Sequence, residues 1–254
     1  MLMEHVLKKD RVWLIAHDDK NMLHDHAASF DLLVEKRLAG LPMAYLLGER
    51  EFLGRMFDVS PSVLIPRPET ELLVETGLSC LQDRKAASVL DLGTGSGIIA
   101  ISIAAARTLW QVVATDMSQG ALDMARRNAA RHKVNIEFFL GSWYQAFPRQ
   151  QQFDLILSNP PYIRDGDQHL DQGDLRYEPR GALTDGADGL SAIREIVQGA
   201  LTHLKEGGQL WVEHGYDQAP EVRSIFNQYG FRGIASKNDL SGIPRITGGR
   251  LLSQ

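Results

Sequence analysis

The chain has 254 residues, 44% hydrophobic and 23% charged, which allows one substantial core and a smaller second unit. Its 27 Lys and Arg residues against 32 Asp and Glu give a formal net charge of -5, which weighs against direct nucleic-acid binding, although a local basic patch would escape this count. Cys80 is the only cysteine and no segment resembles an export signal or a membrane span, so we expect a cytoplasmic protein that does not enter the membrane.

The first part of the chain is predicted to form a helical domain and a stiff connection. Residues 1–48 carry apolar positions at helical spacing with charges between them. Residues 49–63 mix aromatic and β-branched residues with Gly and Pro, which indicates a short hairpin. Pro66 and Pro68 each fix a backbone angle and restrict the preceding residue. We therefore expect a hairpin and linker over residues 49–68.

Residues 69–254 are predicted to form an α/β domain. Short apolar runs alternate with helical patterns, as in a parallel, doubly wound sheet, and the runs lack a period of two because helices cover both faces of such strands. Helices are expected over residues 69–81, 191–204 and 219–229. Strands are expected over residues 87–93, 111–116, 135–140, 153–159, 207–215 and 245–252.

A glycine-rich turn follows the first of these strands, in the segment Asp91-Leu92-Gly93-Thr94-Gly95-Ser96-Gly97. Three glycines let the chain turn sharply and let a ligand lie against bare backbone at the carboxyl edge of the sheet. Such a segment can also be no more than a turn. Its spacing is not GxGxxG, which argues against a dinucleotide.

Asp116 ends the second predicted strand. A carboxylate at the tip of this strand can accept both hydroxyls of a ribose. The alternative is a helix N-cap, because Met117 and Ser118 precede a predicted helix. Together with the glycine-rich turn, the ligand-binding interpretation is favoured.

Asn159-Pro160-Pro161-Tyr162 follows the fourth predicted strand. Asn-Pro is an ordinary turn signal. A fourth strand in this fold, however, lies beside the first, so its end opens onto the crevice of the glycine-rich turn. There a planar NH2 group can donate one hydrogen to the Asn159 side-chain oxygen and one to the Pro160 carbonyl. Its lone pair would then point towards an incoming methyl group, with Tyr162 offering a flat face.

The chemistry that this arrangement supports is methyl transfer to a poorly nucleophilic nitrogen. The lone pair of an amide or aromatic amine is delocalised, so catalysis must come from orientation and from local dipoles. A base is not needed at this step, which explains why the motif contains no His, Cys or acid.

With these motifs, the sequence resembles the class I S-adenosylmethionine-dependent methyltransferases that modify amino nitrogens. LIPRPETE (64–71), NPPYI (159–163) and QGDLRYEPRGAL (172–183) narrow the resemblance to the peptide chain release factor glutamine N5-methyltransferases, the PrmC (HemK) family. The resemblance runs from about residue 33 to the C-terminus.

The resemblance implies a helical N-terminal domain (1–48), the hairpin linker (49–68) and a Rossmann-like catalytic domain (69–254) that methylates the glutamine of the release factors' Gly-Gly-Gln loop. S-adenosylmethionine is the implied cofactor and a release factor the implied partner. Asn159, Pro160 and Tyr162 would be catalytic, and these with Pro161 would bind the substrate. The implied cofactor-binding residues are Gly93, Thr94, Gly95, Ser96, Gly97, Asp116, Trp143 and Asn159.

Other residues have two interpretations. Trp143 matches a position that flanks the adenine in the family, but a packing aromatic residue is the alternative. Charged residues in the linker and in residues 172–183 either line the substrate cleft or form surface ion pairs that each contribute little to stability. These residues are Arg67, Glu69, Asp174, Arg176 and Glu178. His24 and His26 lack partners at ligand spacing, so no metal is expected.

The N-terminus departs from the family, because MLMEHVLKKDRVW resembles the inside of the helical domain. We therefore expect a shortened domain that exposes an apolar face including Val6, Leu7 and Trp13. Three rival functions stay open. An exocyclic base amine has the same donor geometry but needs a basic channel. A nicotinamide oxidoreductase leaves NPPY unexplained, and a non-catalytic cofactor-binding subunit leaves Asn159 and Tyr162 unexplained.

Overall fold

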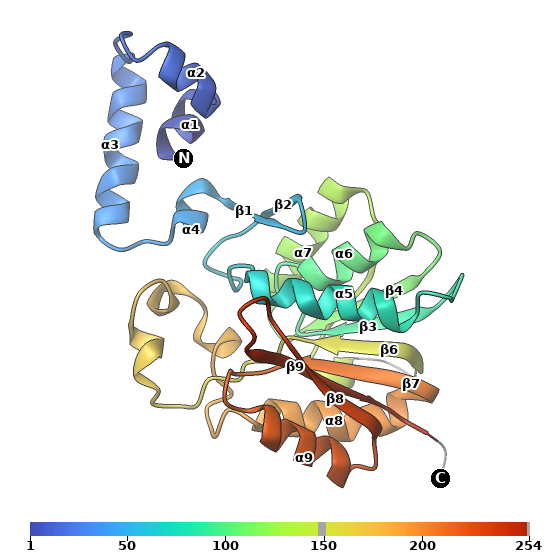
Figure 1. Cartoon of the computed structure of the whole chain (residues 1–254). Helices are drawn as coiled ribbons and strands as arrows, with labels where there is room; N and C mark the ends of the chain where they lie inside the picture. Colours follow the sequence, from blue (N-terminus) through green and yellow to red (C-terminus); the bar gives the residue numbers. More distant parts are fainter. Residues whose placement is uncertain (147–150, 253–254) are drawn as a thin grey trace.

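The computed structural model describes residues 1–146 and 151–252. Its first part is helical, as predicted, with α1 (Leu2–Leu7), α2 (Arg11–Ala16), α3 (His24–Leu38) and α4 (Met43–Leu47). The predicted hairpin is confirmed as β1 (Glu49–Phe52) paired antiparallel with β2 (Arg55–Asp58). Helices α1 to α3 stand away from the main sheet, to which α4 and the hairpin connect them (Figure 1).

The second part of the chain is built on a seven-stranded sheet in the order β5-β4-β3-β6-β7-β9-β8. Its first five strands are parallel and the last two pairings are antiparallel. The strands are β3 (Ser88–Leu92), β4 (Gln111–Asp116), β5 (Glu137–Leu140), β6 (Phe153–Ser158), β7 (Leu204–Glu213), β8 (Arg232–Asn238) and β9 (Pro244–Arg250). The doubly wound fold class is thereby confirmed, and β6 lies beside β3 as expected.

Helices cover both faces of this sheet (Figure 1). One face carries α5 (Glu71–Cys80), α6 (Ile98–Ala106) and α7 (Gln119–His132), and the other carries α8 (Ser191–His203) and α9 (Ala219–Gln228). In β3, Val89 packs with residues of α5 and α6 in a first core cluster. Leu90 and Leu92 pack with residues of α8 and α9 in a second core cluster. Because successive side chains of a strand point to opposite faces, the central strands are apolar throughout.

Three details differ from the sequence predictions. Strand β8 was not predicted, and the helix expected from residue 69 starts with a short 3-10 turn, η1 (Pro68–Thr70). Val6, Leu7 and Trp13 are half-buried, so the expected exposure of these residues is wrong. Instead, the exposed apolar residues of α2 are Val12 and Ile15, at 75% and 66%. No helix in the described ranges combines the length and apolar character that a bilayer span requires.

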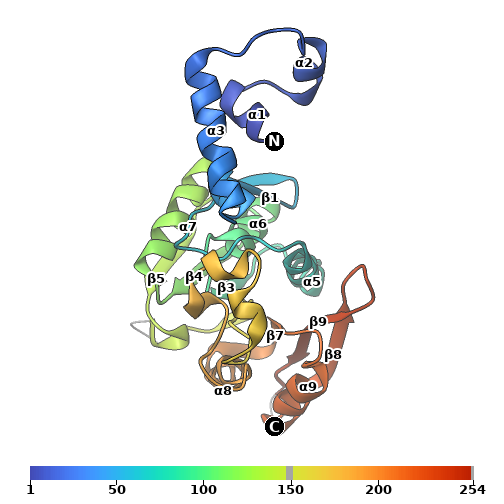
Figure 2. The same ribbon diagram turned by 90° about the vertical axis from the view of Figure 1, so that its left-hand side faces the viewer.

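The segment between β6 and α8 contacts the end of α3, and the two lie side by side in Figure 2. Tyr177 donates a hydrogen bond to the Ala39 carbonyl, and Arg37 pairs with Asp174 at 3.4 Å. This segment and α3 are therefore linked across 135 residues or more of sequence.

Candidate active site

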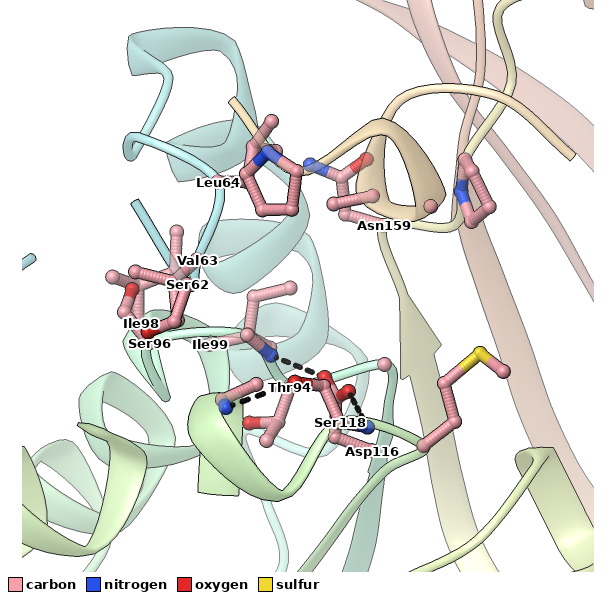
Figure 3. Close-up of a pocket in the computed structure, with 18 of the residues that line it drawn as sticks. Ser62, Val63, Leu64, Thr94, Ser96, Ile98, Ile99, Asp116, Ser118 and Asn159 are labelled. Atoms are coloured by element: carbon pink, nitrogen blue, oxygen red, sulfur yellow. Dashed lines mark hydrogen bonds between the residues drawn. The ribbon is translucent and has the colours of Figure 1, made fainter. Parts of the chain in front are cut away.

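A cavity of about 200 Å³ opens at the carboxyl ends of β3, β4 and β6, where doubly wound sheets bind ligands. In Figure 3, Asp116 lies at one end of the view, Leu64 and Asn159 at the other, and Ser62 and Val63 of the linker at the side. The predicted site residues that line this cavity are Gly93, Thr94, Gly95, Ser96, Asp116, Trp143, Asn159 and Pro161.

The glycine-rich turn is held by hydrogen bonds to β4 and to β3, the strand that it follows. The Gly93 and Thr94 N–H groups donate to the Thr115 carbonyl at 2.9 Å, and the Thr94 hydroxyl donates to the Asp91 carboxylate at 2.6 Å. Asp91 is fully buried, and this burial raises its pKa to about 7. Its Oδ1 atom has no hydrogen-bond partner among the described residues. Asp91 thus anchors the turn from beneath and does not line the cavity.

Gly97 does not line the cavity; it is the N-cap of α6 and has a φ of 87°. A Cβ atom at Gly97 would lie 2.8 Å from Ile101 Cδ1 and 3.2 Å from the Ala125 side chain. Only a glycine combines this backbone angle with so close a helix contact. Gly97 therefore shapes the turn and does not itself face the space in which a ligand would bind.

Asp116 occupies the end of β4 and faces the cavity. Its Oδ2 accepts a hydrogen bond from Gly95 N and its Oδ1 one from Ser118 N, each at 2.9 Å. Burial raises its pKa despite these bonds. The N-cap of α7 is Ser118, whose hydroxyl accepts from Ala121 N at 3.2 Å. Ser118, and not Asp116, is therefore the helix N-cap, and the Asp116 carboxylate lies at the cavity wall.

Trp143 lines the cavity from the segment after β5 and is half-buried. Its backbone has a φ of 42°, unusual for a large side chain. A Cβ atom on Gly93 would lie only 3.2 Å from the indole. The absence of a side chain at Gly93 thus permits the ring to lie across the glycine-rich turn. Trp143 also packs against the second core cluster, so the two interpretations of this residue are compatible.

Asn159 follows β6 and lies between two cavities. Its Nδ2 donates a hydrogen bond to the hydroxyl oxygen of Thr70 at 3.1 Å. A smaller cavity of about 50 Å³ is lined by Pro160 and Tyr162, and Asn159 and Arg67 line both cavities. The four residues of the NPPY segment are thereby divided, with Pro161 on the larger cavity and Pro160 and Tyr162 on the smaller one.

Tyr162 is held at both its backbone and its side chain. Its hydroxyl donates to Glu213 Oε1 at 3.3 Å, and the Gln218 side chain donates to its carbonyl at 3.0 Å. Burial, followed by the Glu213 charge, raises the pKa of the Tyr162 hydroxyl well above its usual value. The ring is therefore neutral and fixed beside the smaller cavity.

The five charged residues with two interpretations occupy different environments. Glu178, whose side chain is fully buried, pairs with Arg67 and accepts from Ile65 N at 2.9 Å, so this pair joins the linker to the segment after β6. Asp174 forms an exposed ion pair with Arg37. The remaining two lie elsewhere: Arg176 lies over the Tyr177 ring at 4.9 Å, and Glu69 raises the pKa of Glu213.

Several cavity residues escaped sequence reasoning. The linker supplies Ser62, Val63 and Pro66, and the segment after β6 supplies Pro179 and Gly181. Both segments carry motifs that were recognised, but nothing in a sequence shows which of their side chains turn inwards. Thr70 lies inside the LIPRPETE segment, but a threonine at a helix start gives no sign of a contact with Asn159, and Glu213 looks like an ordinary residue of a strand.

Comparison with known proteins agrees with this architecture. A methyltransferase from Pyrococcus furiosus superposes with a TM-score of 0.61 at 17% identity, covering 91% of this chain and 100% of its own. The 16S rRNA N2 G1207 methyltransferase of T. Thermophilus, solved with AdoMet and guanosine, gives 0.59 at 19% identity, covering 80% of this chain and 49% of its own. The "Methyltransferase small domain" family model matches residues 69–174. The fold and the site thus define an S-adenosylmethionine-dependent methyltransferase of class I.

Closer relatives identify the family. The release factor glutamine methyltransferase of Bordetella pertussis is 54% identical over 99% of this chain and 93% of its own length. That of Neisseria gonorrhoeae is 48% identical over 99% and 92%. The "PrmC N-terminal domain" model matches residues 1–48. The chain belongs to the release factor glutamine methyltransferase family.

Proposed function

We propose that this protein transfers a methyl group from S-adenosylmethionine to the side-chain nitrogen N5 of the glutamine in the Gly-Gly-Gln loop of peptide chain release factors. The observation that carries the proposal is the position of Asn159 between a cofactor-sized cavity and a smaller one lined by Pro160 and Tyr162. Membership of the family supplies the substrate class.

The larger cavity suits the cofactor. Asp116 presents a half-buried carboxylate that can accept ribose hydroxyls, and Gly93 and Gly95 leave bare backbone along a wall that Thr94 and Ser96 complete. Trp143 offers a flat apolar surface for an adenine ring. The cofactor, when bound, supplies an electrophilic methyl group on a sulfonium.

The acceptor amide would bind at Asn159. With Nδ2 engaged by Thr70, the Asn159 Oδ1 is the atom available to accept one N–H of the substrate glutamine, and the Pro160 carbonyl can accept the other. Both acceptors favour positive charge on the nitrogen as its lone pair attacks. Tyr162 limits the rotation of the amide plane. The chain therefore acts by orientation. The bond from the nitrogen to the methyl carbon would form as the carbon–sulfur bond of the cofactor breaks, and the nitrogen would then release its proton to water.

The main alternative is methylation of an exocyclic amine in a nucleic-acid base. That NH2 group would satisfy the same two acceptors, and the rRNA methyltransferase shares the fold at 19% identity. The net charge of -5 provides no general attraction for phosphates. We therefore propose a protein substrate without direct nucleic-acid binding. We place the reaction in the cytoplasm, since the single Cys80 suits a reducing compartment.

Mass spectrometry of a release factor incubated with the protein and labelled cofactor tests the proposal. We expect a gain of one methyl group on the loop glutamine, and no label when that glutamine is replaced by Ala. Adenine-containing DNA and RNA compete in the same reaction. Label in the nucleic acid, with none in the protein, would establish the alternative.

A further inference from the structure

The side-chain amide of Asn159 can adopt two orientations, and only one of them allows the proposed function. The oxygen must face the substrate, because a substrate NH2 group needs an acceptor. An Asn side chain can rotate by 180° about its last bond and then present its NH2 group instead. In the structure, Nδ2 points to Thr70 at 3.1 Å, which is the productive orientation. A threonine hydroxyl alone does not enforce it, because a hydroxyl can accept or donate.

Glu213 removes this ambiguity. Its carboxyl group, 1% exposed at the end of β7, accepts from the Tyr162 hydroxyl through Oε1. Thr70 is fully buried, and its hydroxyl lies close enough to Glu213 to lower the pKa of that carboxyl group. Glu213 Oε2 is buried and has no hydrogen-bond partner among the described residues, which leaves this oxygen free to accept the hydrogen of the Thr70 hydroxyl. When Glu213 is ionised and the Thr70 hydroxyl turns its one hydrogen to Oε2, the Thr70 oxygen can only accept.

We propose that Thr70 and Glu213 are positioning residues that fix the orientation of the Asn159 amide and of the Tyr162 ring, so that one buried carboxylate aligns both sides of the acceptor site. The inference rests on the proposed function of Asn159. The inference also accounts for the burial of the Glu213 carboxyl group, because a buried carboxyl oxygen lowers stability unless neighbouring groups satisfy it.

The residues of this arrangement come from separate parts of the chain. Thr70 comes from η1 at the end of the linker, Asn159 from the end of β6 and Glu213 from the end of β7, so the set spans three segments of the chain. Glu213 contacts neither cavity wall directly. An effect of Glu213 on the rate must therefore pass through Thr70 or Tyr162.

Replacement of Thr70 is the first test. Val fills the same volume but cannot accept from Asn159, whereas Ser keeps the hydroxyl. We expect Thr70→Val to lower kcat on a release factor by about 10-fold to 100-fold, the range for a misplaced reacting group, with the Kd of S-adenosylmethionine changed by less than about threefold. Thr70→Ser should restore most of the rate. Thr76→Val provides the matched control, since Thr76 is also buried but lies further along α5.

Two further variants separate positioning from simple packing. Glu213→Gln preserves the shape but offers an NH2 group to Thr70, which then donates to Asn159 and favours the reversed amide, so kcat should fall without a loss of melting temperature. In an Asn159→Ala background, Thr70→Val should have no further effect, because Thr70 acts through Asn159. Wild-type kcat from Thr70→Val, or additive losses in the double variant, would overturn the inference. An inactive wild-type protein would instead refute the proposed function.

Discussion

The Asp116 carboxylate accepts a hydrogen bond from the backbone N–H of Gly95 at 2.9 Å, so the end of β4 is tied directly to the glycine-rich turn on β3. One residue thus shapes the cavity and offers it a charged acceptor. Its second oxygen is bonded to Ser118 N, which keeps the carboxylate from rotating away.

Replacing Asp116 by Ala should weaken S-adenosylmethionine binding by about 1 to 3 kcal/mol, the range for buried hydrogen-bond partners left unsatisfied. Asp116→Asn retains one acceptor oxygen and should lose less. Calorimetry with S-adenosylmethionine and with NAD measures both effects, and we expect binding of the former only. An unchanged affinity in the Ala variant would assign Asp116 to the turn alone.

Asn159→Ala should leave the fold and most of the cofactor affinity intact and lower methyl transfer by several powers of ten, since a displacement of about 1 Å already costs roughly 100-fold. Asn159→Asp adds a negative charge beside the sulfonium. This charge favours the cationic ground state and loses its benefit as the sulfonium is neutralised, so the rate should fall even if cofactor binding tightens. Single-turnover assays combined with calorimetry distinguish the two effects. A rate near wild type for Ala would exclude Asn159 from the acceptor site.

Removing Arg67 should destabilise the protein, because the buried Glu178 carboxylate would lose its charged partner. We expect Arg67→Gln to lower the free energy of unfolding by about 2 to 3 kcal/mol, below the full value for a buried pair since Arg67 is 29% exposed. Arg126→Gln breaks the exposed pair with Asp123 and should cost less than about 1 kcal/mol. Urea unfolding compares the variants, and equal losses would show that the Arg67 pair behaves as a surface contact.

Stability should fall as the pH rises through about 7. Burial raises the pKa of Glu213 to about 7 from 4.5 and that of Asp91 to about 7 from 3.8. Between the unfolded and folded pKa values, the native state holds protons that the unfolded chain has released, so the free energy of unfolding decreases with pH. Around Glu213, Glu69 raises the pKa further, whereas Thr70, Tyr162 and Arg245 lower it. Glu213→Gln should reduce the slope, as urea titrations between pH 5 and 8 would reveal; an unchanged slope would contradict the assignment.

Much of the fold was predictable because helix-covered strands leave a strong apolar signal. β3, β4, β5 and β6 all lie within the predicted ranges. β8 escaped because its sequence, RGIASKN, is that of an edge strand with mostly exposed or half-buried side chains. Antiparallel pairing with β9 supplies its backbone bonds, and such pairing does not depend on apolar residues.

The site was predictable where function constrains consecutive residues, as in the glycine-rich turn and NPPY. It was not predictable where one hydrogen bond joins distant positions. Thr70 precedes Asn159 by 89 residues, and a threonine near the start of a helix is common. Only the folded chain shows which polar residues meet. The same limit applies to Glu213, which the sequence presents as the end of an ordinary strand.

The close approach of α3 to the segment after β6 has an evolutionary consequence. A Cβ atom at Gly40 would lie 2.0 Å from a guanidinium nitrogen of Arg176, and the φ of Gly40 is 99°. The end of the flexible Arg176 side chain can move aside, but the backbone angle of Gly40 would strain any larger residue. We therefore expect relatives to retain glycine at position 40 even where position 176 varies, so that selection on this junction acts on the backbone of the helical part and not on the charge that faces it.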